Sequence, residues 1–164
     1  VIQNAAATVS ITDNDALALS LVASTPDSAE SAGSATFKLS ASGVTSTEQS
    51  FQVAFQTSDG SALQVGSGQG DYEARSGSVA VTGSATSRVS VNNLAAILVT
   101  LNDDQVNEDD ESFSASISVA NAPAGVSVQT SSASVRILDD DALSLTLQSS
   151  ALREDGGTGA AGCR

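Results

Sequence analysis

Histidine, tryptophan and methionine are absent from the sequence, which also has only one cysteine, one tyrosine and four phenylalanines. Without histidine, the chain lacks the commonest general base of enzymes and the commonest nitrogen ligand of metal sites. The lone Cys163 excludes an internal disulfide. Because aromatic residues amount to only 3%, Val, Ile, Leu and Ala must fill any core.

Positive charge is also scarce, since 6 Lys and Arg residues stand against 19 Asp and Glu residues, a net charge of −13. A chain this acidic repels the phosphates of nucleic acid, so we expect no nucleic-acid partner. No stretch approaches the ~20 apolar residues of a membrane span, so we expect no direct membrane insertion of this segment. Enzyme chemistry is disfavoured as well, because the sequence lacks a G-x-S-x-G nucleophile motif and the aromatic residues that stack on sugars.

What the sequence does contain is a repeat of long period. The segment "VSITDNDALALSL" at 9–21 recurs as "VRILDDDALSLTL" at 135–147, an offset of 126 residues. This period exceeds the 20–50 residues of solenoid repeats and predicts a tandem array of whole domains. We therefore interpret residues 1–16 as the last strand of a preceding module and 17–141 as one complete module. Residues 142–164 are then the truncated start of a following module.

Within the complete module, apolar residues alternate with polar ones, as expected for half-buried strands. The alternating segments are 17–21, 35–39, 51–55, 79–81, 89–101, 113–119 and 135–137. The fifth segment is interrupted by "NNLA". Abundant Ser, Thr, Gly and Asp between the segments favour tight turns over helices. Seven short strands in about 125 residues predict an all-β fold, an immunoglobulin-like antiparallel β-sandwich.

Acidic residues fall in the loops of one predicted pole. Chain direction alternates from strand to strand, so the loops after the first, third and fifth strands meet the segment that follows the seventh. These connections carry Asp27, Glu30, Asp59, Asp71, Glu73, the acidic residues of 103–111 and Asp139 to Asp141. The loops of the opposite pole contain one acid, Glu48. The densest stretch, "NDDQVNEDDESF", has six carboxylates between Asp103 and Glu111.

Such a cluster needs a counter-charge. Two like charges ~5 Å apart repel by about 3 kcal/mol at an effective dielectric near 20, and a domain is stable by only ~5–15 kcal/mol. The loops offer only Arg75 to offset this repulsion. Carboxylate oxygens without His or Cys favour Ca²⁺ or Mg²⁺, and crowded flexible ligands favour the 6–8-coordinate Ca²⁺. The sequence therefore predicts bound calcium ions, while a solvated, metal-free acidic surface stays open as the alternative.

Five segments, in order, are similar to those of Calx-beta domains, the calcium-binding modules of sodium–calcium exchangers and of many extracellular or bacterial surface proteins. They are "ESAGSATFKLS" at 30–40, "TSDGSA" at 57–62, "GDYEARSGSVAV" at 70–81, "LNDDQVNEDDESFSASI" at 101–117 and "VRILDDDA" at 135–142. The resemblance implies nine calcium ligands: Glu30, Asp71, Asp103, Asp104, Glu108, Glu111, Asp139, Asp140 and Asp141. It also implies a carbonyl ligand near Val106, while Gln105 stands where the family often has an acid.

The function that we expect is a calcium-binding structural repeat that rigidifies a tandem array, with adjacent modules of the same chain as partners. An extracellular or cell-surface location, as in an adhesin or stalk of a secreted bacterial protein, fits the composition. Two alternatives remain: a calcium sensor that regulates a membrane transporter, and a metal-free acidic spacer.

Overall fold

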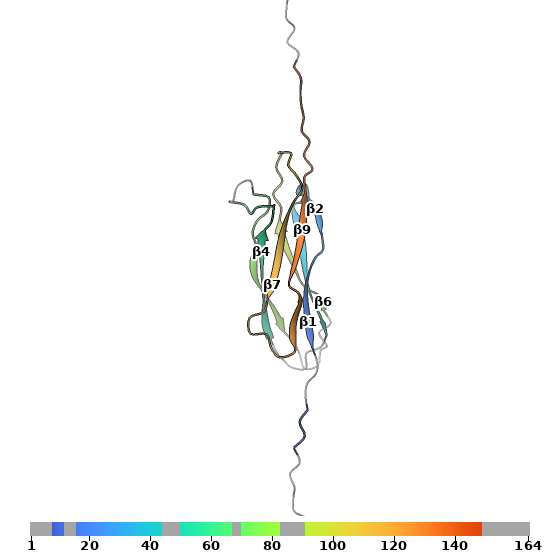
Figure 1. Ribbon diagram of the computed structural model, residues 1–164, viewed down its shortest axis with the longest axis vertical. Coiled ribbons are helices and arrows are strands. Elements are labelled where there is room, and N and C mark those ends of the chain that lie inside the picture. Colours follow the sequence, from blue (N-terminus) through green and yellow to red (C-terminus); the bar gives the residue numbers. More distant parts are fainter. Residues whose placement is uncertain (1–7, 12–15, 44–49, 67–69, 83–90, 149–164) are drawn as a thin grey trace, which may run out of the picture.

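The chain folds into two β-sheets that lie face to face, as the computed structural model shows for residues 8–11, 16–43, 50–66, 70–82 and 91–148 (Figure 1). The strands are β1 (Leu17–Ala23), β2 (Asp27–Ala29), β3 (Ser34–Gly43), β4 (Ser50–Asp59), β5 (Ser76–Thr82), β6 (Val91–Thr100), β7 (Glu111–Ser118), β8 (Val126–Thr130) and β9 (Ser132–Leu138). One sheet has the order β6-β3-β1-β8 and the other β2-β9-β7-β4-β5. The predicted all-β, immunoglobulin-like sandwich is confirmed.

The described strands number nine rather than seven, because β2 and β8 lie in segments that were predicted as connections. β1 pairs with β3 in one sheet, and β2 then pairs with β9 in the other. Pro26 lies at the crossing, where its missing N–H removes a ladder donor, while its carbonyl accepts from the Arg136 N–H. Similarly, β8 pairs with β1 and β9 with β7. These crossings make β1–β8 and β2–β9 parallel pairs, whereas the prediction had antiparallel pairs throughout.

The interruption predicted at "NNLA" is wrong, because β6 runs through it as one strand. The pairing with β3 shifts instead: Leu39 lies opposite Ala95, and Ala41 lies opposite Val91. Between these two pairs, one residue of β3 thus faces three of β6, so the two extra residues are accommodated as a bulge. A bulge places the surplus on one strand without ending the ladder.

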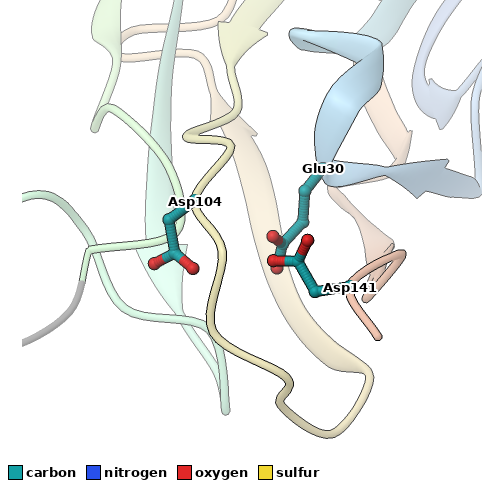
Figure 2. A group of neighbouring side chains, drawn as sticks. All are labelled: Glu30, Asp104 and Asp141. Atoms are coloured by element: carbon teal, nitrogen blue, oxygen red, sulfur yellow. The ribbon is translucent and has the colours of Figure 1, made fainter. Parts of the chain in front are cut away.

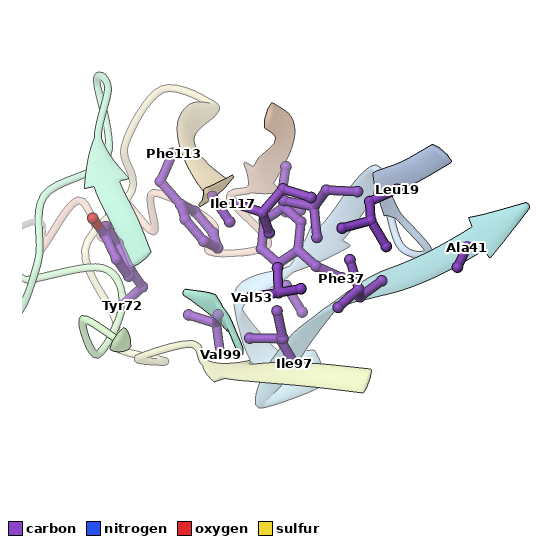
Figure 3. Close-up of a cluster of buried hydrophobic side chains, with 14 of the residues drawn as sticks. Leu19, Phe37, Ala41, Val53, Tyr72, Ile97, Val99, Phe113 and Ile117 are labelled. Carbon is purple, nitrogen blue, oxygen red and sulfur yellow. The ribbon is translucent and has the colours of Figure 1, made fainter. Parts of the chain in front are cut away.

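The core lies between the sheets and is mainly aliphatic, as the scarcity of aromatic residues requires. Leu19 of β1, Val53 of β4 and Val99 of β6 are completely buried and point into the same layer (Figure 3). The alternating residues of the predicted strands supply this layer wherever the structure describes them. Phe113 is its aromatic centre, with a T-shaped contact to Phe37 and a stacked contact to Tyr72 at centroid separations of 5.8 and 4.2 Å.

The described residues 142–148, which follow the acidic segment after β9, extend away from the sandwich (Figure 1). Leu143, Leu145 and Leu147 are each more than 80% exposed and belong to no strand. At the other flank, the described residues Val9 and Ile11 are equally exposed. No helix in the described part of the chain has the length and apolar character to cross a bilayer.

Candidate metal centre

Four connections that supply acids meet at the pole of the sandwich where β9 ends (Figure 1). The first is a 3-10 turn at Glu30–Ala32, which follows β2 directly. Gly33 closes this turn in the left-handed region at a φ of 71°, and its carbonyl accepts from the Leu101 N–H. This bond ties the turn to the start of the acidic loop between β6 and β7.

Glu30 lies at the centre of two of the acidic groups. It joins Asp104 and Asp141 in one group and Asp103 and Asp140 in the other, with the potential ligand oxygens of each group within 4.8 Å of one another. Figure 2 shows the first group, with the carboxylates of Glu30 and Asp141 close together and Asp104 on the facing loop. The Ser31 hydroxyl donates to Asp140 at 2.5 Å. Residues from two other connections therefore converge on Glu30.

A third group consists of Asp71, Glu108 and Glu111, again within 4.8 Å. Asp71 is only 8% exposed, and its Oδ2 accepts from the Leu63 N–H at 2.6 Å. Its backbone is fixed as well, because its N–H donates to Leu63 and its carbonyl accepts from Asn102. The long connection between β4 and β5 thus holds Asp71 against the loop that carries the two glutamates.

Of the nine ligands that the resemblance to Calx-beta domains implies, Asp139 is the one that belongs to none of these groups. Its Oδ2 accepts from the Asn107 amide at 3.0 Å, and its Oδ1 accepts from the Asp141 N–H at 3.4 Å. The other eight residues each belong to at least one group. Asn107 also donates to the Asp141 carbonyl at 2.9 Å.

Burial and mutual repulsion disfavour the charged forms of several of these acids. Burial raises the pKa of Glu30 from 4.5 to about 7, and the charge of Asp104 adds to the effect. Burial also raises the pKa of Glu111 to about 7. A hydrogen bond with Asp71 and the negative charge of Asp71 are the next largest causes of this increase. The pKa of Asp141 is raised by desolvation and by Asp139. A carboxylate in low dielectric beside like charges holds its proton more tightly.

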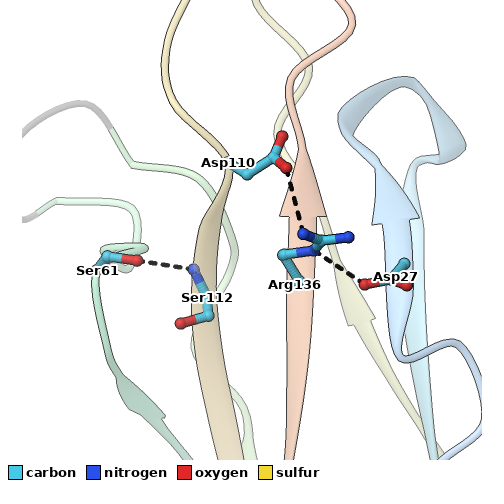
Figure 4. A network of polar contacts seen from close by, with 5 residues as sticks. All are labelled: Asp27, Ser61, Asp110, Ser112 and Arg136. Atoms are coloured by element: carbon cyan, nitrogen blue, oxygen red, sulfur yellow. Dashed lines mark hydrogen bonds and ion pairs between the residues drawn. The ribbon is translucent and has the colours of Figure 1, made fainter.

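Arg136, rather than the Arg75 suggested by the sequence, pairs with two acidic side chains near this pole. Its guanidinium lies 3.0 Å from Asp27 and 3.5 Å from Asp110, linking β2, β9 and the acidic loop (Figure 4). All three side chains are about half exposed, so each pair adds only ~0–1 kcal/mol of stability. Arg75 contacts Thr57 through its backbone. The alternation of strand β9 places Arg136 on the outer face, but its partners could not be read from the sequence.

Tyr72 anchors the connection between β4 and β5 to the core. The side chain is 1% exposed and stacks on Phe113, and its hydroxyl donates to Asp59 Oδ1 at 2.5 Å. Asp59 also accepts from the Gln64 N–H at 3.1 Å. Because Tyr72 follows Asp71 directly, the aromatic stack fixes one end of the third acidic group.

The arrangement is chemically suited to a hard cation. Its donors are carboxylate oxygens, which favour Ca²⁺ or Mg²⁺ over softer metals. One of these oxygens, Asp141 Oδ2, is buried without a hydrogen-bond partner among the described residues. A buried polar atom without a partner requires an explanation such as an ion. The fold and this cluster together define an immunoglobulin-like β-sandwich module with an acidic pole whose carboxylates suit a hard cation.

Comparison with known proteins gives the family. The Calx-beta domain profile matches residues 12–141, and the chain belongs to the Calx-beta domain family. Among solved structures, the apo-form Calx CBD1 domain is similar, with a TM-score of 0.57 and 24% identity over 76% of this chain and 98% of that one. The Calx CBD2 domain, at 15% identity and a TM-score of 0.54, covers 79% of this chain and 91% of its own.

A longer structure, CBD12 from CALX1.2, is 25% identical with a TM-score of 0.57. This chain matches it over 76% of its own length but spans only 46% of the CBD12 chain. A search of curated proteins gave no match.

Proposed function

We propose that this domain binds calcium ions at its acidic pole. The observation that carries the proposal is the convergence of acids from four connections on groups whose oxygens lie within 4.8 Å, with Glu30 shared by two groups. Membership of the Calx-beta family, whose domains bind calcium, supports it. Eight acids would serve as ligands: Glu30, Asp71, Asp103, Asp104, Glu108, Glu111, Asp140 and Asp141. The ninth expected ligand, Asp139, is considered separately below.

Calcium would supply the positive charge that Arg136 alone does not provide. Glu30 and Asp71 are nearly buried, and burial of a charge is unfavourable unless a counter-charge accompanies it. The residues of the chain hold the site in place: Gly33 closes the turn that carries Glu30, and Tyr72 anchors the segment that carries Asp71. An ion with 6–8 oxygen ligands fits this crowded set better than the strictly octahedral Mg²⁺.

Isothermal titration calorimetry on chelator-treated protein tests this proposal. We expect saturable heat with Ca²⁺ and an affinity for Mg²⁺ at least tenfold weaker, because Mg²⁺ retains its waters and requires a smaller cage. The variant Asp141→Asn should weaken Ca²⁺ binding by about tenfold or more. Equal binding of both ions, or no heat with Ca²⁺, would leave the metal-free acidic spacer as the better account.

We further propose that calcium at this pole stiffens the junction between consecutive modules of one chain. Only residues 139–142 separate the end of β9 from Leu143, Leu145 and Leu147, which repeat the buried Leu17, Leu19 and Leu21 of β1 at the offset of 126. Exposed leucines at positions that are buried in the first copy support a following module. Asp140 and Asp141 lie in this junction, so an ion bound there would restrict its bending. A stalk or adhesin on a cell surface would use such a module as an extender.

Small-angle X-ray scattering tests whether calcium stiffens the junction. The protein for this test contains two copies of residues 16–141, one full repeat of 126 residues, in tandem. Calcium should increase the radius of gyration and sharpen the long-distance part of the pair distribution, compared with chelator. The same protein with Asp103→Asn and Asp104→Asn in its first copy is the control and should respond much less. Identical curves in calcium and chelator would exclude the stiffening while leaving calcium binding itself intact.

A further inference from the structure

One amide group links two of the connections that meet at the acidic pole. Asn107, in the loop between β6 and β7, donates through Nδ2 to Asp139 Oδ2 at 3.0 Å and to the Asp141 carbonyl at 2.9 Å. Both acceptors lie in the segment that follows β9, more than thirty residues away in sequence. A neutral amide can contact carboxylates in this way without competing with a cation as a lysine would.

Asp139 makes the contacts expected of an anchor, a residue whose hydrogen bonds hold its own segment in place. Both of its oxygens accept hydrogen bonds, one from Asn107 and one from the Asp141 N–H, and it lies outside every group of converging acids. The next two residues differ from Asp139 in this respect, because Asp140 and Asp141 each belong to a group that contains Glu30. The bond to Asn107 therefore fixes the backbone from which these two acids project.

We propose that Asn107 is a positioning residue for the calcium site and that Asp139 is its anchor rather than an ion ligand. This inference rests on the proposed calcium binding. In the ion-free protein, the two bonds hold Asp140 and Asp141 where the ion needs them. Without the bonds, the segment samples other conformations, and the apparent Kd rises in inverse proportion to the fraction that is competent to bind. Holding the segment in place in advance reduces the ordering that binding must supply.

Two measurements on the whole chain test the role of Asn107: calorimetric titration with calcium chloride, and amide hydrogen exchange of the segment 138–145 in chelator. Asn107→Ala should weaken Ca²⁺ binding about tenfold and speed exchange in this segment by a similar factor. Gln105→Ala is the matched control, because Gln105 is an exposed amide of the same loop with no hydrogen bond among the described residues. Its Kd and exchange should stay within about twofold of the wild type.

The role of Asp139 is tested by comparing Asp139→Asn with Asp141→Asn. Asparagine retains one acceptor oxygen, which can accept from the Asn107 amide, and gives up only the longer 3.4 Å bond from the Asp141 N–H. Asp139→Asn should therefore bind calcium within about threefold of the wild type, while Asp141→Asn loses at least tenfold. Equal losses in the two variants would make Asp139 a ligand and overturn the anchor role. Unchanged binding in Asn107→Ala would overturn the positioning role. A wild-type protein that binds no calcium would overturn the proposed function itself, and this inference with it.

Discussion

Calcium is expected to raise the melting temperature of the domain by several degrees, and Asp103→Asn combined with Asp104→Asn is expected to remove most of that rise. An ion that binds only the folded state stabilises it by RT ln(1 + [L]/Kd), roughly 2.7 kcal/mol at a hundredfold excess over Kd. For a domain of this size, that corresponds to a shift of about 5–15 °C. Each aspartate belongs to a different group around Glu30, so the double change affects both groups.

In chelator the same double variant should melt higher than the wild type. Two negative charges disappear from a cluster whose members repel one another by about 3 kcal/mol per pair at ~5 Å. Asparagine at position 104 retains the oxygen that accepts from the Val106 N–H, so the loop keeps its local turn. Opposite signs in calcium and in chelator distinguish loss of a metal site from damage to packing, because a packing defect lowers the melting temperature in both.

A charge-matched control is available at the same pole. Glu73 and Asp109 have exposed side chains and belong to none of the three groups. The double variant Glu73→Gln with Asp109→Asn changes the net charge equally, yet it should keep a calcium response close to that of the wild type. Differential scanning calorimetry of the three proteins, each in calcium and in chelator, checks the prediction. A calcium response in the Asp103–Asp104 variant equal to that of the control would show that these aspartates are not ligands.

The ion-free domain is expected to lose stability as the pH rises from about 5 to 8. Glu30 and Glu111 have pKa values near 7 in the folded protein against an ordinary 4.5, so between these values the folded state binds more protons than the unfolded state. Stability then falls with increasing pH, and it is greatest below the unfolded pKa, where both states are protonated. The difference for Glu30 alone corresponds to at most about 3 kcal/mol, which would lower the melting temperature by about 5–15 °C.

Saturating calcium should flatten or reverse this trend, because the ion binds the deprotonated carboxylates and its affinity rises with pH. The measurement is the melting temperature from pH 5 to 8.5, in chelator and in millimolar calcium. Glu30→Gln is the informative variant, since it removes one of the two raised carboxyls and should reduce the slope in chelator by about half. A melting temperature that increases with pH in chelator would contradict the assigned burial and repulsion of these glutamates.

Much of the fold followed from local patterns that act within a few residues. The alternation of Leu17, Leu19 and Leu21 requires one buried face, because successive side chains of a strand point to opposite sides. The same rule applies to Phe113 and Val135, and Gly- and Asp-rich turns reverse the chain between such strands. Once direction alternates, the loops that carry Glu30 and Asp103 must lie at the same pole. The acidic pole was therefore determined by the order of the elements.

Only the tertiary structure decided which side chains at that pole touch. Whether Arg136 pairs with Asp27 depends on β9 lying beside β2, and this follows from the crossing at Pro26 between the sheets. Whether Asn107 contacts Asp139 depends on how the loop between β6 and β7 folds over the end of β9. Neither contact produces a periodic pattern in the sequence. Each contact joins two single residues that are distant in sequence, and strand order and register bring them together. The sequence by itself determined the sandwich and the gathering of charge, while packing between distant strands decided that Asp139 lies outside the groups of converging acids.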